Sequence, residues 1–193
     1  MLWTIRRTLS QLKTTSRLRA WRQHLLAAVE ETFWVSLSVV GLWGLCAQAE
    51  LLTSSNHQGV GLVIAAFGAS ITLLISRPRS PMSAPWNALA GSIVSAVIGI
   101  CLYRQSAMDP LTASALSVIL AILAMHLLHA MHPPGGAIAL LVVLGSPAVH
   151  TLGWAFVVMP IGIGTLWLLV IRALRLRWMA RSMDEQIVPE SIA

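Results

Sequence analysis

An interruption between two apolar runs constrains this chain more than any other feature. It reads Met131-His132-Pro133-Pro134-Gly135-Gly136-Ala137-Ile138. Its two prolines remove two backbone N–H donors and its glycines lower helix propensity, so we expect the helix to break over residues 132–136. A new helix should start at about Ala137, with free N–H groups that attract an anion. Non-helical backbone persists at membrane depth only inside protein or beside a wet cavity, so the break is a candidate site.

Composition sets the class of protein in which this break lies. The chain has 193 residues, of which 56% are hydrophobic and 10% charged, with a mean hydropathy of +0.76. That leaves too little polar surface to cover a soluble globule, and we expect an all-α, polytopic membrane helix bundle. No nucleophile elbow, P-loop, HExxH motif or carboxylate pair occurs, so we expect no enzyme activity, no cofactor and no nucleic-acid partner.

Apolar runs of spanning length divide the chain. They cover Phe33–Leu52, Gly59–Ser76, Asn87–Tyr103, Leu111–Leu128 and Leu152–Ile171. The short run 137–144 beyond the break should complete about six crossings in all. We therefore expect a basic N-terminal segment over residues 1–31, a transmembrane domain over 32–172 and a C-terminal tail over 173–193.

Positive charge predicts the orientation. If both terminal segments share one side with the connection that carries Arg77 and Arg79, that side holds 12 of the 13 Lys and Arg residues, leaving Arg104 opposite. By the positive-inside rule both termini are then cytoplasmic, in a bacterial inner membrane and in contact with its lipids. The Arg-rich, Ser/Thr-rich start also fits a transit peptide, which would place the protein in a plastid or another organelle.

A second interruption is expected at Phe67-Gly68-Ala69-Ser70. Shifting the chain by 67 positions aligns residues 68–75 with 135–142, and 87–99 with 154–166. Two halves of three spans each would form an inverted 3+3 repeat with two broken helices. In such folds the breaks meet near the midplane, where half-helix N-termini point toward an anionic substrate.

The two expected breaks and the basic connection supply the candidate anion site. Its substrate-binding residues are Gly68, Ala69, Ser70, Thr72, Asn87, His132, Pro133, Pro134, Gly135, Gly136 and Ala137. Arg77 and Arg79 would form its vestibule. Because Glu50 and Asp109 fall at expected interfaces, the spans carry no acid to balance a cation, which favours a small inorganic anion.

Other readings compete with anion transport. One is a membrane scaffold or sensor whose basic N-terminal segment binds lipid or a partner. Another is a metal site on His126, His129 and His132, although the first two are better explained as packing or interfacial residues, so we expect no metal. Glycines such as Gly91 and Gly99 suit close helix packing, and such small-residue faces also permit a homodimer.

The motifs together resemble the HPP family of integral membrane proteins. The resemblance rests on His132-Pro133-Pro134 with the following Gly135-Gly136-Ala137, on the Phe67–Ser70 motif, and on Ser80-Pro81-Met82-Ser83-Ala84-Pro85-Trp86-Asn87 followed by Gly91. It implies a fold usually described with four spans, and nitrite as the transported anion. In the family pattern an Arg commonly precedes the Asn and a His follows the Gly, where this chain has Trp86 and Ser92.

Overall fold

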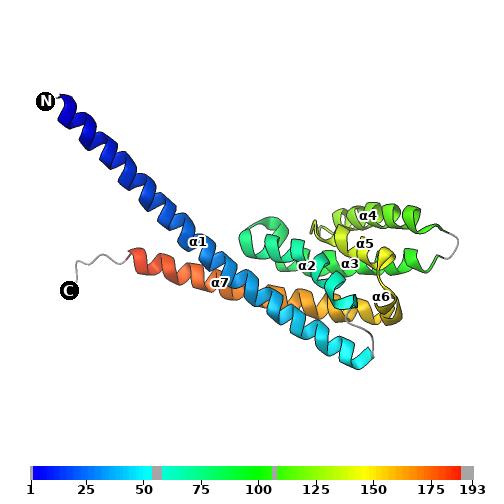
Figure 1. Cartoon of the computed structure of the whole chain (residues 1–193). Helices are drawn as coiled ribbons and strands as arrows, with labels where there is room; N and C mark the ends of the chain where they lie inside the picture. Colours follow the sequence, from blue (N-terminus) through cyan, green and yellow to red (C-terminus); the bar gives the residue numbers. More distant parts are fainter. Residues whose placement is uncertain (1, 54–57, 106–107, 188–193) are drawn as a thin grey trace. The chain divides into compact units, whose positions relative to one another are not determined.

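Most of the described chain is helical, and no strand occurs among the described residues. A computed structural model describes residues 2–53, 58–105 and 108–187. Its elements are α1 (Leu2–Thr53), α2 (Gln58–Ser76), the 3₁₀ turn η1 (Pro81–Ser83), α3 (Pro85–Tyr103), α4 (Pro110–Leu127), α5 (Gly135–Leu144), α6 (Pro147–Leu152), the π-helical segment η2 (Val157–Gly162) and α7 (Ile163–Ile187) (Figure 1). The all-α prediction is confirmed.

The chain divides into two compact units, and the boundary between them falls within α1. Residues 1–34 form the first unit and residues 35–193 the second. The expected basic segment is helical from Leu2 and runs without a break into the first apolar run. The expected C-terminal tail continues α7 as far as Ile187, and its residues 188–193 lie outside the described part.

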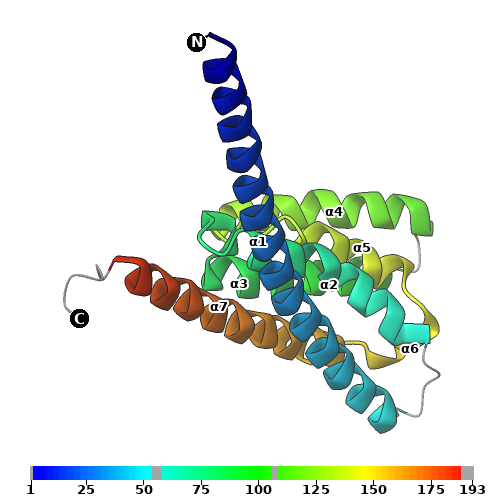
Figure 2. The ribbon, with the colours of Figure 1, turned by 60° about the vertical axis from the view of Figure 1, so that its left-hand side comes forward.

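Helices α3, α4 and α5 pack against one another and form the centre of the second unit (Figures 1 and 2). Glycines allow α3 and α5 to come this close. A Cβ atom added at Gly99 of α3 would lie 2.7 Å from Val142 Cβ and 2.8 Å from the Ala139 carbonyl oxygen of α5. No larger residue fits there without a shift of backbone, so the predicted packing role of this glycine is confirmed.

The start of α4 is capped at the surface. The Asp109 carboxylate accepts hydrogen bonds from the backbone N–H groups of Leu111 and Thr112, at 3.1 and 3.0 Å. Hydrogen bonds from Thr112 hold the pKa of this carboxyl group below its usual value. Pro110 takes the first helical position, where a missing N–H has no effect on the helix.

Helices long and apolar enough to cross a membrane occur at four places in the described residues. They cover Ala20–Gln48, Pro85–Tyr103, Pro110–Leu127 and Val157–Ser182, and shorter apolar helices cover Val63–Ser76 and Gly135–Leu144. The expected spans Asn87–Tyr103 and Leu111–Leu128 agree with α3 and α4 to within a few residues. The count of about six crossings and the inverted repeat stay predictions.

Interruptions occur at one expected place and at one further place in the last span. The chain leaves the helix between α4 and α5, as the two prolines predict, but over residues 128–134 and not 132–136, and α5 starts at Gly135 and not at about Ala137. By contrast α2 runs unbroken through Phe67–Ser70, so the predicted second break is wrong. The last span is interrupted instead, because α6 ends at Gly153, which has a φ of +50°, and Met159 inside η2 has extended backbone angles.

Candidate functional site

His132 is the residue on which the candidate site is built. It lies in the break between α4 and α5 with a fully buried side chain. Its Nε2 lies 3.2 Å from Ser70 Oγ of α2, and its Nδ1 lies 3.2 Å from the Met82 carbonyl oxygen in η1. One imidazole ring therefore joins the break to two segments that lie 62 and 50 residues earlier in the chain.

The partners of the ring determine its tautomer. A carbonyl oxygen can only accept, so Nδ1 carries a hydrogen and donates it to Met82. In the neutral ring Nε2 then accepts from the Ser70 hydroxyl group, which is itself 2% exposed. Protonation of Nε2 would require the Ser70 hydroxyl to change from donor to acceptor, so this pair can exist in two hydrogen-bonded states.

The η1 turn is held in place by hydrogen bonds of its own. The buried Ser83 hydroxyl lies 2.8 Å from the Arg77 carbonyl oxygen and 3.2 Å from that of Leu73. Asn87 Nδ2 donates to the Pro81 carbonyl oxygen at 3.1 Å. Asn87, predicted to bind substrate, thus supports the turn that presents the Met82 carbonyl group.

Small residues of α3 form the wall behind His132. A Cβ atom at Gly91 would lie 2.7 Å from the Ala130 carbonyl oxygen and 2.8 Å from His132 Cβ. One at Gly135 would lie 2.5 Å from Ser95 Oγ, whose hydroxyl donates to the Gly91 carbonyl oxygen at 2.7 Å. The break therefore lies directly on the backbone of α3, which fixes the position of the imidazole ring.

Backbone donors at the start of α5 differ from the expectation. The N–H groups of Gly135, Gly136 and Ala137 donate to the carbonyl oxygens of His132, Pro133 and Pro134, at 2.8, 3.2 and 3.1 Å. The expectation of free donors there is wrong, because a tight turn at the prolines lets each amide find a carbonyl three residues back. These three amide groups are therefore not free to bind a solute.

Other predicted site residues lie outside this cluster. Thr72 is exposed and its hydroxyl donates to the Gly68 carbonyl oxygen of its own helix at 2.9 Å. Ala69 is exposed, and a Cβ atom at Gly68 would meet nothing within 4 Å. Ala137 lines an apolar groove of about 280 Å³ between α2 and α5.

Prolines and glycines of the break fall into an inner and an outer set. Pro134, Gly135 and Gly136 are buried, whereas Pro133 is exposed. Of the predicted substrate-binding residues, the side chains of Ser70 and His132 are the two that a hydrogen bond joins directly.

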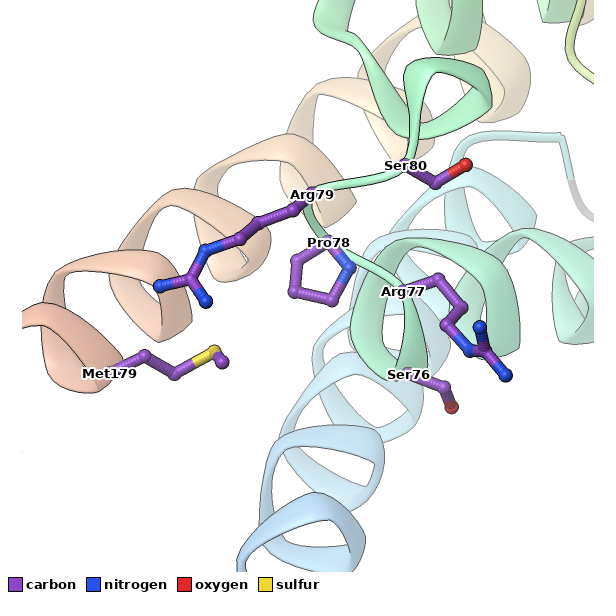
Figure 3. A pocket seen from close by; sticks show the side chains of 6 residues that line it. All are labelled: Ser76, Arg77, Pro78, Arg79, Ser80 and Met179. Carbon is purple, nitrogen blue, oxygen red and sulfur yellow. The ribbon is translucent and has the colours of Figure 1, made fainter.

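Arg77 and Arg79 line a hollow of about 460 Å³ with Ser76, Pro78, Ser80 and Met179. Figure 3 shows the two arginine side chains on opposite sides of Pro78, with Arg79 reaching toward the part of α7 that carries Met179. The Arg172 Nε of α7 donates to the Pro78 carbonyl oxygen at 2.9 Å. The predicted vestibule is therefore a basic, exposed hollow where the α2–α3 connection meets α7.

The three histidines at the end of α4 do not gather. His126 is exposed and its Nδ1 donates to the Ile122 carbonyl oxygen at 2.9 Å, while His129 is exposed with a φ of +48°. His132 points into the protein. Across the described residues, no group of three His, Cys, Asp or Glu side chains is placed to hold a metal ion.

Three polar groups of interest were missed by reasoning from the sequence. The Met82 carbonyl group is backbone, so no residue type marks it. The buried hydroxyl groups of Ser92 and Thr165 have no hydrogen-bond partner among the described residues. A sequence signal existed for Ser92, because it follows Gly91 directly in a stripe of small residues on α3.

Comparison with known proteins agrees with this arrangement of motifs. A family model described as the HPP transmembrane region matches residues 26–183. The chain belongs to the HPP family. Its HPP motif is the break that carries His132, and the motif before α3 supplies the ring's backbone partner. No solved structure matches the chain significantly.

Two curated relatives come from Dictyostelium discoideum, and each is named only as a transmembrane protein. One is 37% identical over 112 residues and the other 34% identical over 114 residues, in each case 56% of this chain. This HPP chain spans 35% and 39% of their lengths. Together with the apolar helices, the family match makes this an integral membrane protein.

Proposed function

We propose that the protein is a transporter or channel for a small monovalent anion, nitrite first. The observation that carries this proposal is the buried His132–Ser70 pair, a polar contact between α2 and the break inside an apolar bundle. Ionisable groups at membrane depth are expensive and mark solute or proton pathways. When the ring is protonated it donates from Nε2 to the Ser70 oxygen, and the Ser70 hydroxyl hydrogen is then free to bond an anion.

Charge supports an anion over a cation. Between Glu50 and Asp184 the sequence has one acidic residue, Asp109, which caps α4 at the surface. A cation in the bundle would find no carboxylate there, whereas an anion would approach through the hollow lined by Arg77 and Arg79. Nitrite is the first choice because the family resemblance points to it.

Location and orientation belong to the same proposal. We place the chain in a bacterial inner membrane with both termini cytoplasmic. The hydrogen bond from Arg172 to Pro78 supports this, because it brings the arginines of α7 and of the α2–α3 connection to one end of the bundle. Arg104 follows α3 at its other end. Such an asymmetry is what the positive-inside rule requires.

Uptake into proteoliposomes tests the function. We expect purified protein to carry nitrite into vesicles, and we expect His132→Ala and Ser70→Ala to lose most of this flux. His126→Ala is the matched control, because that exposed histidine bonds within its own helix and should leave flux unchanged. Wild-type flux equal to that of empty vesicles would overturn the proposal.

A further inference from the structure

Two buried hydroxyl groups in the described helices, those of Ser92 and Thr165, have no hydrogen-bond partner. Serines and threonines in a helix commonly donate back to a carbonyl oxygen three or four residues earlier. Seven do so here, namely Thr32, Thr72, Ser95, Ser114, Ser117, Thr151 and Ser182. Ser92 of α3 and Thr165 of α7 do not, although both are at most 2% exposed.

Burial without a partner destabilises the protein unless something else accepts the hydrogen. A buried hydroxyl group that has lost water and gained no hydrogen bond lowers stability, and alanine or valine would avoid that loss. Ser95, one turn along α3 from Ser92, shows that a back-bond is within reach on this helix. The Ser92 hydroxyl makes no such bond.

Both hydroxyl groups lie on helices that contact each other. Helix α3 contacts α7 and also the interrupted segment η2. Thr165 is seven residues before Arg172, so the two share a face of α7, and Arg172 bonds to Pro78 in the connection that leads into α3. Ser92 follows Gly91, which lies against His132.

Two segments of irregular backbone contact helix α3. The break that carries His132 packs on it through Gly91, and η2, with the extended Met159, contacts it as well. Irregular backbone within a membrane is tolerated where it is buried in protein or lines a polar route. The two unpartnered hydroxyl groups occur on this same helix and on the one that follows η2.

We propose that Ser92 and Thr165 line the solute's route between α3 and α7 and donate hydrogen bonds to the anion as it passes. The identity of the anion as nitrite rests on the proposed function, whereas the polar lining rests on the two hydroxyl groups. Each would be satisfied when solute or its accompanying water is present.

Transport kinetics and thermal unfolding together test whether Ser92 and Thr165 line the route of the solute. For Ser92→Ala and Thr165→Val we expect the KM for nitrite to rise about tenfold, since each loses a hydrogen bond to a charged group. We expect the unfolding midpoint Tm to stay level or rise by about 2–4 °C. Ser117→Ala of α4 is the control: its KM should not change, and its Tm should fall because its buried hydroxyl is bonded to the Ser114 carbonyl oxygen.

Thiol labelling separates this inference from the proposed function. Cys46 and Cys101 are first replaced by Ser, and Ser92→Cys or Ser95→Cys is then treated in vesicles with a small methanethiosulfonate reagent. We expect rapid labelling at position 92 and none at 95. Labelling at 92 without nitrite uptake by the wild type would overturn nitrite as the solute and retain the polar route. Equal labelling at both positions, or a KM for Ser92→Ala within twofold of wild type, would overturn the inference.

Discussion

Two segments meet at the Ser70–His132 hydrogen bond, and their backbones behave differently. Residues 67–70 continue α2 as regular helix, whereas residues 128–134 leave the helix altogether. Glycine does not cause the difference, because Gly68 lies inside α2 and Gly135, which follows the break, is the first residue of α5. The difference is proline, because Pro133 and Pro134 cannot donate and clash with the preceding turn.

In both segments the polar contact inside the apolar bundle is made by a side chain. In α2 the backbone is satisfied by its own helix, and a hydroxyl group at one position, Ser70, is left to point inward. After the prolines the N–H groups of residues 135–137 are bonded within the turn, and a side chain, His132, is turned into the protein. Each segment therefore contributes a side chain to the polar contact.

The largest expected effect comes from removing the imidazole ring. His132→Ala should unfold more easily by about 3 kcal/mol, because it leaves the Ser70 hydroxyl and the Met82 carbonyl group without the ring and opens a cavity. Chemical denaturation in detergent micelles measures this, with His126→Ala as the exposed control. A change below about 1 kcal/mol would show that the ring does not hold the three segments together.

The next largest loss of stability is expected from a methyl group added at Gly135, directly after the break. Gly135→Ala should lose about 1–3 kcal/mol of stability, because its Cβ atom would meet Ser95 Oγ and the Gly91 carbonyl oxygen. Thermal unfolding followed by tryptophan fluorescence gives the shift. If the variant were as stable as wild type, the break would not lie tightly against α3.

A smaller loss of stability is expected when Ser70, the hydrogen-bond partner of His132, is replaced. Ser70→Ala removes the donor to His132 Nε2, which leaves one buried acceptor unmatched and should lower stability by about 1–2 kcal/mol. Ser70→Thr, which keeps the hydroxyl group, should recover much of this. Equal stability of the alanine variant and wild type would mean that this contact adds nothing to the fold.

The smallest effect sharpens the contrast between the two segments. Gly68→Ala should be neutral or stabilising by up to about 1 kcal/mol, because α2 is helical there and its Cβ atom would meet nothing within 4 Å. The measurement is again the Tm, beside Gly135→Ala. Destabilisation comparable to that of Gly135→Ala would indicate that residues 67–70 are not regular helix in the membrane.

Much of the fold follows from residue types alone. Hydropathy and the scarcity of acids predict a membrane helix bundle, and the Pro-Pro pair predicts the break, because the missing N–H groups and steric clash of proline are local. His132 and Ser70 were both among the expected site residues, and the structure joins them. Gly68 was expected to break α2 and does not, since one glycine weakens a helix by less than tertiary packing can restore.

The pairing of polar groups could not be predicted from the sequence and is seen only in the folded bundle. The sequence placed His132 in a break, and its Met82 partner is a backbone carbonyl group 50 residues away that no residue type identifies. The amides after the prolines were expected to be free and are bonded within the turn. Local chemistry determines where a helix ends, whereas the pairing of polar groups depends on contacts between distant segments, which exist only once the bundle has packed.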